Sequence, residues 1–273
     1  MNRMLAKTVS LRSGITMSIA EAGSPSGMPL VMLHGYTDSW RSFEPLVRHM
    51  PASFRIIALS QRGHGDSGKP MNGYSVAQFA KDTCEALDEL EIASCLMLGH
   101  CMGSLVAMNV TAQMPDRVRG LVLIGAMRSV CGNVACEELW RSGVETMQDP
   151  IDRTFVRSFQ ESTVARPADP RFMHQVVEES LKVPAHVWRS TLRSLLDEDT
   201  TALPQRISTP TYIIWGDKDE ITLSAEQQAL TSAIRNSTLV IHEGGGHAPH
   251  WEAPSRVAGE ISGWAEHRLK SAA

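Results

Sequence analysis

One cysteine lies in a turn that can make it a nucleophile. The segment Gly99-His100-Cys101-Met102-Gly103 follows an apolar run at 95–98 and precedes a helical stretch. Its glycines allow a strained turn in which larger side chains would clash with the strand or the helix. Such a turn lifts the central side chain above the strand end and places it at a helix N-terminus, where the helix dipole favours a thiolate. The motif alone also fits a small buried cysteine, so its interpretation depends on the residues that accompany it.

An acid and a histidine follow in the order that a nucleophilic mechanism requires. Two carboxylates in Gly216-Asp217-Lys218-Asp219 come directly after an apolar run, and His247 follows the glycines 244–246. A histidine behind a glycine loop can approach a nucleophile and take its proton, while a carboxylate holds the imidazole in the required tautomer. All three groups fall at strand ends, where the catalytic groups of open α/β sheets gather.

A second turn can supply donors for an oxyanion. His34-Gly35-Tyr36 follows the apolar run 30–33, and a flexible turn there can aim the backbone N–H of Tyr36 inward. Together with the N–H of Met102, it would form an oxyanion hole in which each donor is worth roughly 10²–10³ in rate.

The elements that must position these residues alternate along the chain. Short apolar runs separated by helical patterns predict an α/β fold with a mostly parallel eight-stranded sheet and helices on both faces. The predicted strands are residues 7–11, 15–21, 30–33, 55–59, 95–98, 121–124, 211–215 and 238–242. The predicted helices are residues 43–50, 75–90, 102–114, 225–234 and 254–270.

One segment interrupts this alternation. Residues 128–207 contain no convincing strand, and apolar pairs such as Phe155 and Phe159 recur at helical spacing. We therefore predict a helical cap inserted after the sixth strand, at 128–207, and a core formed by 1–127 and 208–273. The apolar stripes of this cap are typical of packing faces.

Composition narrows the classes of function. The chain has 273 residues, is 42% hydrophobic and carries a net charge of −4 with scattered Lys and Arg, which indicates a globular enzyme and no nucleic-acid partner. No apolar run reaches the roughly 20 residues of a membrane span, and the first ten residues lack the apolar core of a signal peptide. The five cysteines are an odd set without a CxxC pair, which favours reduced thiols, no metal and a cytoplasmic location.

These motifs resemble the α/β-hydrolase superfamily. The resemblance extends from about residue 8 to 264, includes Arg62-Gly63-His64-Gly65-Asp66-Ser67, and is strongest to capped bacterial esterases, lactonases, epoxide hydrolases and C–C bond hydrolases. The family places its acid last in G-x-x-D, which implies Asp219, with Asp217 as the alternative. Two positions depart from the family: Cys101 replaces the usual serine, and Ser60 stands where aspartate is frequent.

We therefore predict a hydrolase of a small apolar ester, lactone or related carbonyl compound that forms an acyl-enzyme. Cys101 would be the nucleophile, His247 the base and Asp219 its orienting acid, with Tyr36 and Met102 as oxyanion donors. The predicted substrate-binding residues are His100, Trp140 and Trp188. No cofactor or metal is expected, the partner is a small-molecule substrate, and the chain is expected to be a monomer or homodimer without membrane contact.

Several alternatives remain open at this point. An acyltransferase would pass the same thioester to an alcohol or amine, whereas C–C bond cleavage or cofactor-free oxygenation would need no acyl-enzyme. A non-hydrolytic binding protein would have no need of the acid, the histidine and the oxyanion loop together. The sequence also leaves open the substrate and whether Cys101 is native or replaces a serine.

Overall fold

A single eight-stranded sheet organises the part of the chain that the structure describes, residues 2–270 of a computed structural model. Its strands are β1 (Leu5–Ser10), β2 (Thr16–Gly23), β3 (Met28–Leu33), β4 (Phe54–Leu59), β5 (Cys95–His100), β6 (Val118–Ile124), β7 (Thr211–Gly216) and β8 (Ser237–His242). The strand order is β1-β2-β4-β3-β5-β6-β7-β8. β2 pairs antiparallel with β1 and β4, and every other pair is parallel. The predicted fold class is therefore confirmed.

The register brings the functional turns to one edge of the sheet. Leu33 at the end of β3 pairs with Gly99 in β5, and Gly99 pairs in turn with Leu123 in β6. β6 then pairs in parallel with β7, and β7 with β8. Because these strands are parallel, the segments that leave their carboxyl ends emerge side by side. The turns at 34–36, 99–103 and 216–219 are thus neighbours in space, although they are far apart in sequence.

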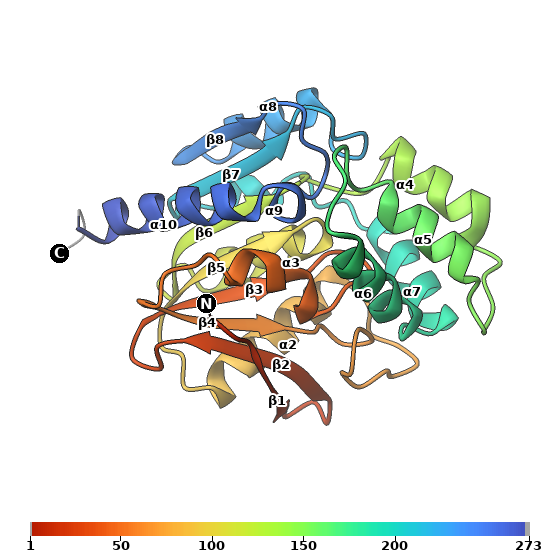
Figure 1. The fold of residues 1–273 in the computed structure, drawn as a ribbon, viewed down its shortest axis with the longest axis horizontal. Coiled ribbons are helices and arrows are strands. Elements are labelled where there is room, and N and C mark those ends of the chain that lie inside the picture. The colour runs from red at the N-terminus through yellow and green to blue at the C-terminus, as the bar shows by residue number, and fades with distance from the viewer. Residues whose placement is uncertain (1, 271–273) are drawn as a thin grey trace.

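Helices cover both faces of the sheet (Figure 1). One buried apolar cluster joins a face of the sheet to α2 (Val76–Glu89), α3 (Met102–Gln113) and α8 (Ser224–Ala233). A second cluster joins the opposite face to α1 (Glu44–Val47) and α10 (Pro254–Lys270), and α9 (Pro249–Glu252) leads into α10. Both faces are covered, which explains why the central strands are apolar along their whole length.

One predicted helix differs from the structure. In place of a helix at 43–50 there is a 3₁₀ turn, η1 (Trp40–Phe43), followed by the single turn of α1. The Ser39 side chain accepts a hydrogen bond from the N–H of Arg41 and so starts the turn early. Pro45 then occupies the first turn of α1, where its missing N–H costs nothing. Capping thus moved the helical segment toward the N-terminus, which the apolar spacing did not indicate.

The segment between β6 and β7 is helical, as predicted. It contains α4 (Val134–Leu139), the π-helical turn η2 (Trp140–Val144), α5 (Arg153–Glu161), α6 (Pro170–Leu181), α7 (Ala185–Asp197) and the 3₁₀ turn η3 (Leu203–Arg206). Helices α4 to α7 gather at one end of the sheet (Figure 1). The side chains of Asn133, Asp152 and Asp169 cap α4, α5 and α6. The division into a core and a cap of 128–207 stays a prediction, and residues 1 and 271–273 of the predicted core lie outside the described residues.

An aromatic cluster attaches this helical segment to the core. Trp188 on α7 is completely buried, and its ring meets those of Phe155, Phe159 and Tyr36 at centroid distances of 6.1, 5.5 and 5.2 Å. The Tyr36 hydroxyl donates a 2.7 Å hydrogen bond to the Trp188 carbonyl. Because Tyr36 belongs to the loop after β3, this contact joins the cap to the core by packing and by a buried polar bond. No helix within residues 2–270 is long and apolar enough to cross a membrane.

A buried ion pair fixes the loop after β4. The Arg62 guanidinium binds both carboxylate oxygens of Asp82 on α2, with 2.7 Å between Nη2 and Oδ1, and Gln78 donates to the same carboxylate. Both charged side chains are almost fully buried. Removing one partner would leave the other charge buried and unpaired.

We expect Asp82→Ala to lower the free energy of unfolding by about 3–5 kcal/mol, because Arg62 loses its buried partner. Arg12→Ala removes a pair with Asp88 in which the arginine is largely exposed, and should cost about 0–1 kcal/mol. Urea denaturation monitored by circular dichroism measures both. An Asp82→Ala loss no larger than that of Arg12→Ala would contradict the role of the buried pair.

Candidate active site

The turn that carries Cys101 has a backbone conformation that ordinary residues avoid. Cys101 lies between β5 and α3 with φ 51° and ψ −120°. A methyl group on Gly99 would lie 2.2 Å from the Gly103 carbonyl oxygen, and one on Gly103 would lie 2.1 Å from the Leu33 carbonyl oxygen. Both positions therefore require glycine, because no side chain fits between these backbones. The turn holds Cys101 at the start of α3, as the motif predicted.

His247 and Asp219 form a buried hydrogen-bonded pair. His247 Nδ1 lies 2.8 Å from Asp219 Oδ2, and both side chains are almost inaccessible to solvent. The other carboxylate oxygen of Asp219 accepts from the backbone N–H groups of Ile221 and Thr222 at 2.8 and 2.9 Å, and the Thr222 hydroxyl also donates to this carboxylate. These donors fix the carboxylate, which in turn fixes the ring.

The neighbouring acid, Asp217, contacts the loop before His247 and not the His247 ring. Asp217 accepts a 2.5 Å hydrogen bond from the N–H of Gly244 and is exposed at the surface, so it braces the loop that carries His247. Gly246 in that loop passes close to the segment between α5 and α6, since a methyl group there would lie 2.5 Å from the Ala165 nitrogen. Gly246, one of the glycines predicted to let the histidine approach, is thus required by a close backbone contact.

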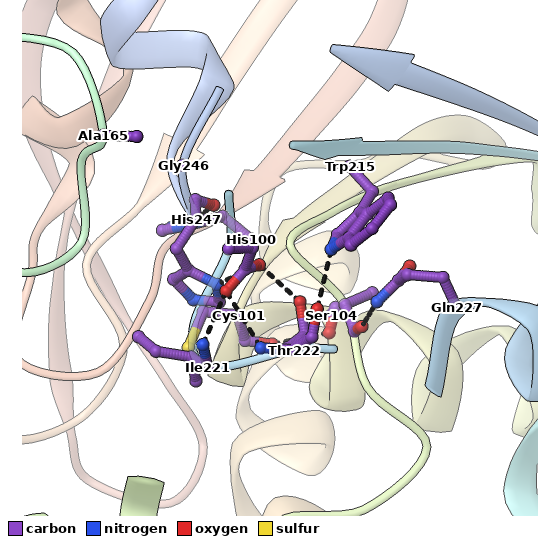
Figure 2. A network of polar contacts seen from close by, with 12 residues as sticks. His100, Cys101, Ser104, Ala165, Trp215, Ile221, Thr222, Gln227, Gly246 and His247 are labelled. Carbon is purple, nitrogen blue, oxygen red and sulfur yellow. Dashed lines mark hydrogen bonds and ion pairs between the residues drawn. The ribbon is translucent and has the colours of Figure 1, made fainter. Parts of the chain in front are cut away.

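The charges around His247 favour its imidazolium form. Burial opposes that charge, but the Asp219 carboxylate and, next, the Cys101 sulfur raise the pKa of His247 well above its ordinary value. Burial raises and the His247 charge lowers the pKa of Asp219, with a net lowering. Within residues 2–270, His247 Nε2 has no hydrogen-bond partner. Figure 2 shows the His247 ring and the Cys101 side chain pointing toward one another, so Nε2 is available to take a proton from the thiol.

Two backbone amides flank the cysteine. Gly35 approaches it so closely that a methyl group there would lie 3.3 Å from Cys101 Cβ. Tyr36 and Met102 line the same cavity as Cys101, and neither backbone N–H has an acceptor within residues 2–270. The His34 ring supports this loop, because its Nε2 accepts a 2.9 Å hydrogen bond from the Gln61 N–H. The loop after β3 and the start of α3 therefore each place one backbone donor beside Cys101.

The cavity above Cys101 is small and apolar. Its volume is about 140 Å³, and it lies between the core and helices α4, α5 and α7. Cys101, His247, Tyr36 and Met102 form its floor. Its apolar walls include Met127, Val130, Leu139, Phe159, Leu192 and Leu195.

The predicted substrate-binding residues have different locations. His100 lines the cavity, whereas Trp140 and Trp188 are not among its lining residues in the described chain. Trp188 is buried behind the cavity wall in the aromatic cluster. Trp140 is half-buried, and the Arg193 guanidinium lies 5.5 Å from its ring centroid. For these two residues the structure corrects the prediction, because their apolar faces pack between helices.

The sequence analysis missed several polar residues of the cavity, among them Asp38, Cys136 and Gln160. Asp38 follows the oxyanion loop, and Cys136 and Gln160 come from α4 and α5. Asp38 had no periodic signal, although it lies close to the predicted oxyanion turn at 34–36. The two cap residues lacked even this proximity, because only the folded chain brings them above Cys101.

Comparison with known proteins identifies this arrangement. Residues 28–254 match the family described as alpha/beta hydrolase fold. The chain belongs to the α/β-hydrolase fold family. An esterase from Exiguobacterium antarcticum shares the fold with a TM-score of 0.85 and 21% identity, over 96% of this chain and 100% of that one.

Named relatives of this α/β hydrolase are enzymes. A 2-(acetamidomethylene)succinate hydrolase of Mesorhizobium japonicum is 36% identical over 110 residues, which are 40% of this chain and 39% of that protein. A 3-oxoadipate enol-lactonase of Acinetobacter baylyi is 22% identical over 88% of this chain and 89% of its own length. The relatives at 34% and 36% identity are thus matched over less than half of their length. These names confirm that the chain is an enzyme of this fold.

We expect Asp219→Asn to lower the pKa of His247 more than Cys101→Ser does, because the carboxylate stabilises the imidazolium more strongly than the sulfur. Nitrogen-15 chemical shifts of labelled imidazole rings, followed against pH, measure this. His250 is the internal control: burial lowers its pKa to about 3, so it should stay neutral in every variant above pH 5. An unchanged His247 titration in Asp219→Asn would contradict the assigned pair.

Proposed function

We propose that this α/β hydrolase cleaves a small apolar ester, lactone or related carbonyl compound through an acyl-enzyme on Cys101. One observation carries the proposal: the buried His247–Asp219 pair presents toward Cys101 an Nε2 atom that has no hydrogen-bond partner among residues 2–270. The two free amides beside that cysteine add the donors that an acyl-transfer reaction needs.

The proposed reaction begins with proton transfer from Cys101 to His247 Nε2. The thiolate attacks the substrate carbonyl carbon, and the oxygen that becomes negative accepts hydrogen bonds from the N–H groups of Tyr36 and Met102. As the C–O bond breaks, the His247 imidazolium gives its proton to the departing alkoxide. The acyl group is then bound to Cys101 as a thioester, and the alcohol, or the hydroxyl end of an opened lactone, is released.

Water completes the proposed cycle. His247 accepts a proton from a water molecule as that water attacks the thioester carbonyl, and the same two amides stabilise the second tetrahedral intermediate. Collapse of this intermediate breaks the C–S bond and releases the acid product with the thiolate restored. Asp219 keeps the His247 ring in one tautomer and balances its charge throughout. Every step uses groups of this chain.

Electrostatics supports sulfur as the attacking atom. A thiolate at a helix N-terminus is favoured by the helix dipole, and an adjacent imidazolium favours it further. Against the effect of burial, the Asp219 carboxylate raises the pKa of His247 well above its ordinary value, which makes its imidazole a ready acceptor for the Cys101 proton. Cysteine at position 101 is therefore chemically matched to its surroundings.

The cavity and the relatives support the class of substrate. A volume of about 140 Å³ with mostly apolar walls fits a short acyl group better than a long chain. The enol-lactonase and esterase among the similar proteins act, by their names, on ester bonds. A small-molecule substrate therefore remains the proposed partner, and the proposed steps proceed with no cofactor.

We expect short-chain esters or lactones to acylate Cys101, giving a mass increase equal to the acyl group when acid-quenched protein is analysed intact. Cys101→Ala should lose the adduct and at least about 10³-fold in kcat/KM, and His247→Ala should lose a similar factor, because the two groups act as a unit. Exposed Cys131 provides the matched control, since Cys131→Ala should keep both adduct and rate.

Full turnover by Cys101→Ala would refute the acyl-enzyme. Repeating the assay with an added alcohol or amine separates hydrolysis from acyl transfer, because only an acyltransferase would convert the added acceptor into the main product.

A further inference from the structure

The active-site cavity has an unusual balance of charge. Beside the catalytic pair it contains one further carboxyl group, that of Asp38, and within residues 2–270 no lysine or arginine is among its lining residues. A carboxylate on a substrate would therefore find no cation in this cavity except the imidazolium of His247, which is already paired with Asp219.

Asp38 lies close to the nucleophile. A methyl group on Gly35 would lie 3.1 Å from Asp38 Oδ2, 3.0 Å from His100 Nδ1 and 3.3 Å from Cys101 Cβ. The carboxyl and the cysteine thus flank the same backbone position. Any acyl group attached to the Cys101 sulfur occupies the cavity that Asp38 also lines.

Hydrogen bonds hold the Asp38 carboxyl in one orientation. Gln160 Nε2, on α5, donates to Asp38 Oδ1 at 3.1 Å and to Ser180 Oγ at 2.8 Å. Oδ2 lies 3.9 Å from His100 Nδ1, a nitrogen that has no hydrogen-bond partner within residues 2–270. One oxygen is therefore bound by the cap, and the other is left toward Gly35 and His100.

The groups that face Asp38 place the pKa of its carboxyl near neutral pH. Burial is the main cause that raises the pKa of Asp38 to about 7, opposed by Gln160, by the His247 charge and by the Gly35 amide. Glu179 on α6 also raises the pKa of Asp38, and Arg41 and Lys182 bind Glu179 at 3.4 and 2.8 Å.

Two neighbouring histidines do not share this titration. Burial lowers the pKa of His100 well below its usual value and that of His250 to about 3, so both stay neutral near pH 7. The pKa of His247 is shifted in the opposite direction, well above the ordinary value. Asp38 is therefore the group in this cluster whose charge changes near neutral pH.

We propose that Asp38 is a specificity-determining residue that restricts Cys101 to uncharged acyl groups, because its ionised carboxylate turns anionic substrates away. This inference rests on the proposed function only in taking the Cys101 sulfur as the attacking atom. In its neutral form the carboxyl can donate a hydrogen bond to a substrate oxygen. In its ionised form it places a negative charge in a small apolar cavity, where repulsion of a second anion is weakly screened.

A pair of alkylating reagents tests the proposal without requiring turnover. Iodoacetamide and iodoacetate both react by attack of the Cys101 thiolate on carbon, which forms an S–C bond and releases iodide. They have similar size, but only iodoacetate carries a negative charge. The ratio of their rates at Cys101, measured by peptide mass spectrometry, cancels the fraction of thiolate, so it reports only how the site discriminates against the anion.

For the wild-type protein we expect the iodoacetamide-to-iodoacetate rate ratio to rise about tenfold between pH 6 and pH 8, as Asp38 loses its proton. Asp38→Asn keeps a neutral hydrogen-bonding side chain, and its ratio should stay flat at the acidic value of the wild type. Exposed Cys131 in the same samples is an internal control whose ratio should not change over this range.

Glu179→Gln is the matched control variant. Glu179 faces Asp38 but is not among the cavity-lining residues, and removing its charge should lower the pKa of Asp38. The pH midpoint should therefore move down while the tenfold rise remains. Loss of the rise in Glu179→Gln with its retention in Asp38→Asn would assign the effect to Glu179 and overturn the proposal.

The remaining outcomes separate this inference from the proposed function. A flat wild-type ratio at a Cys101 that both reagents alkylate would refute the role of Asp38 and leave the nucleophile assignment intact. The same rise in Asp38→Asn as in the wild type would also refute it. Failure of both reagents to modify Cys101, while Cys131 reacts, would contradict the nucleophile assignment itself and with it the inference.

Discussion

Three segments meet closely around Cys101, and at Gly99 and Gly103 the facing backbones leave no space for an additional carbon. Gly99 packs against Gly103, Gly103 packs against the end of β3, and Gly35 packs over Cys101. This contact forces the positive φ of Cys101, because the chain has to leave β5 and enter α3 within two residues. The position of the sulfur, the direction of the Met102 amide and the approach of the loop at 34–36 all follow from it. Thr37, in the loop after β3, has a positive φ of 65° as well, so both turns beside the cavity contain a residue in the left-handed region.

The cavity is lined both by residues at the strand ends and by the helical segment between β6 and β7. The proposed nucleophile, base and oxyanion donors lie at the ends of the strands, while α4, α5 and α7 supply part of the cavity wall. Gln160 reaches down from α5 to the Asp38 carboxyl, so a core acid is oriented by a cap amide. The side chain of Asp38, the proposed specificity-determining residue, is therefore positioned jointly by the loop after β3 and by α5.

Sequence reasoning succeeded where local patterns decide the structure. The glycines around Cys101 and the alternation of apolar runs report steric and burial constraints that act within a few residues, and the structure has the predicted strands and their order of appearance. The same reasoning failed for Trp140 and Trp188, because an aromatic residue at helical spacing indicates a buried face without indicating which cavity or cluster lies beside it. Asp38 was overlooked since a single acid in a loop gives no periodic signal, and its environment depends on α5 and α6, more than a hundred residues away. Residue spacing alone also did not decide which acid pairs with His247, because Asp219 and Asp217 lie in the same turn after β7.

The hydrogen bond from Tyr36 to the Trp188 carbonyl has a consequence for how such an enzyme can diversify. The backbone amide of Tyr36 is a proposed oxyanion donor, and its side chain packs against α7. The loop that carries this donor is therefore held in place by a helix that also lines the cavity. A cap transplanted from another member of the family would have to reproduce the Trp188 carbonyl and the surrounding rings. Without them, the loop that contains Tyr36 would lose its hydrogen bond and its packing partner. Exchange of whole caps is thus constrained by the side chain of Tyr36, although the proposed contribution of Tyr36 to the reaction comes from its backbone N–H. Substitutions of cavity-wall residues such as Leu192 and Leu195 leave the contact between Tyr36 and Trp188 in place. They can therefore change the substrate without displacing the loop that contains Tyr36.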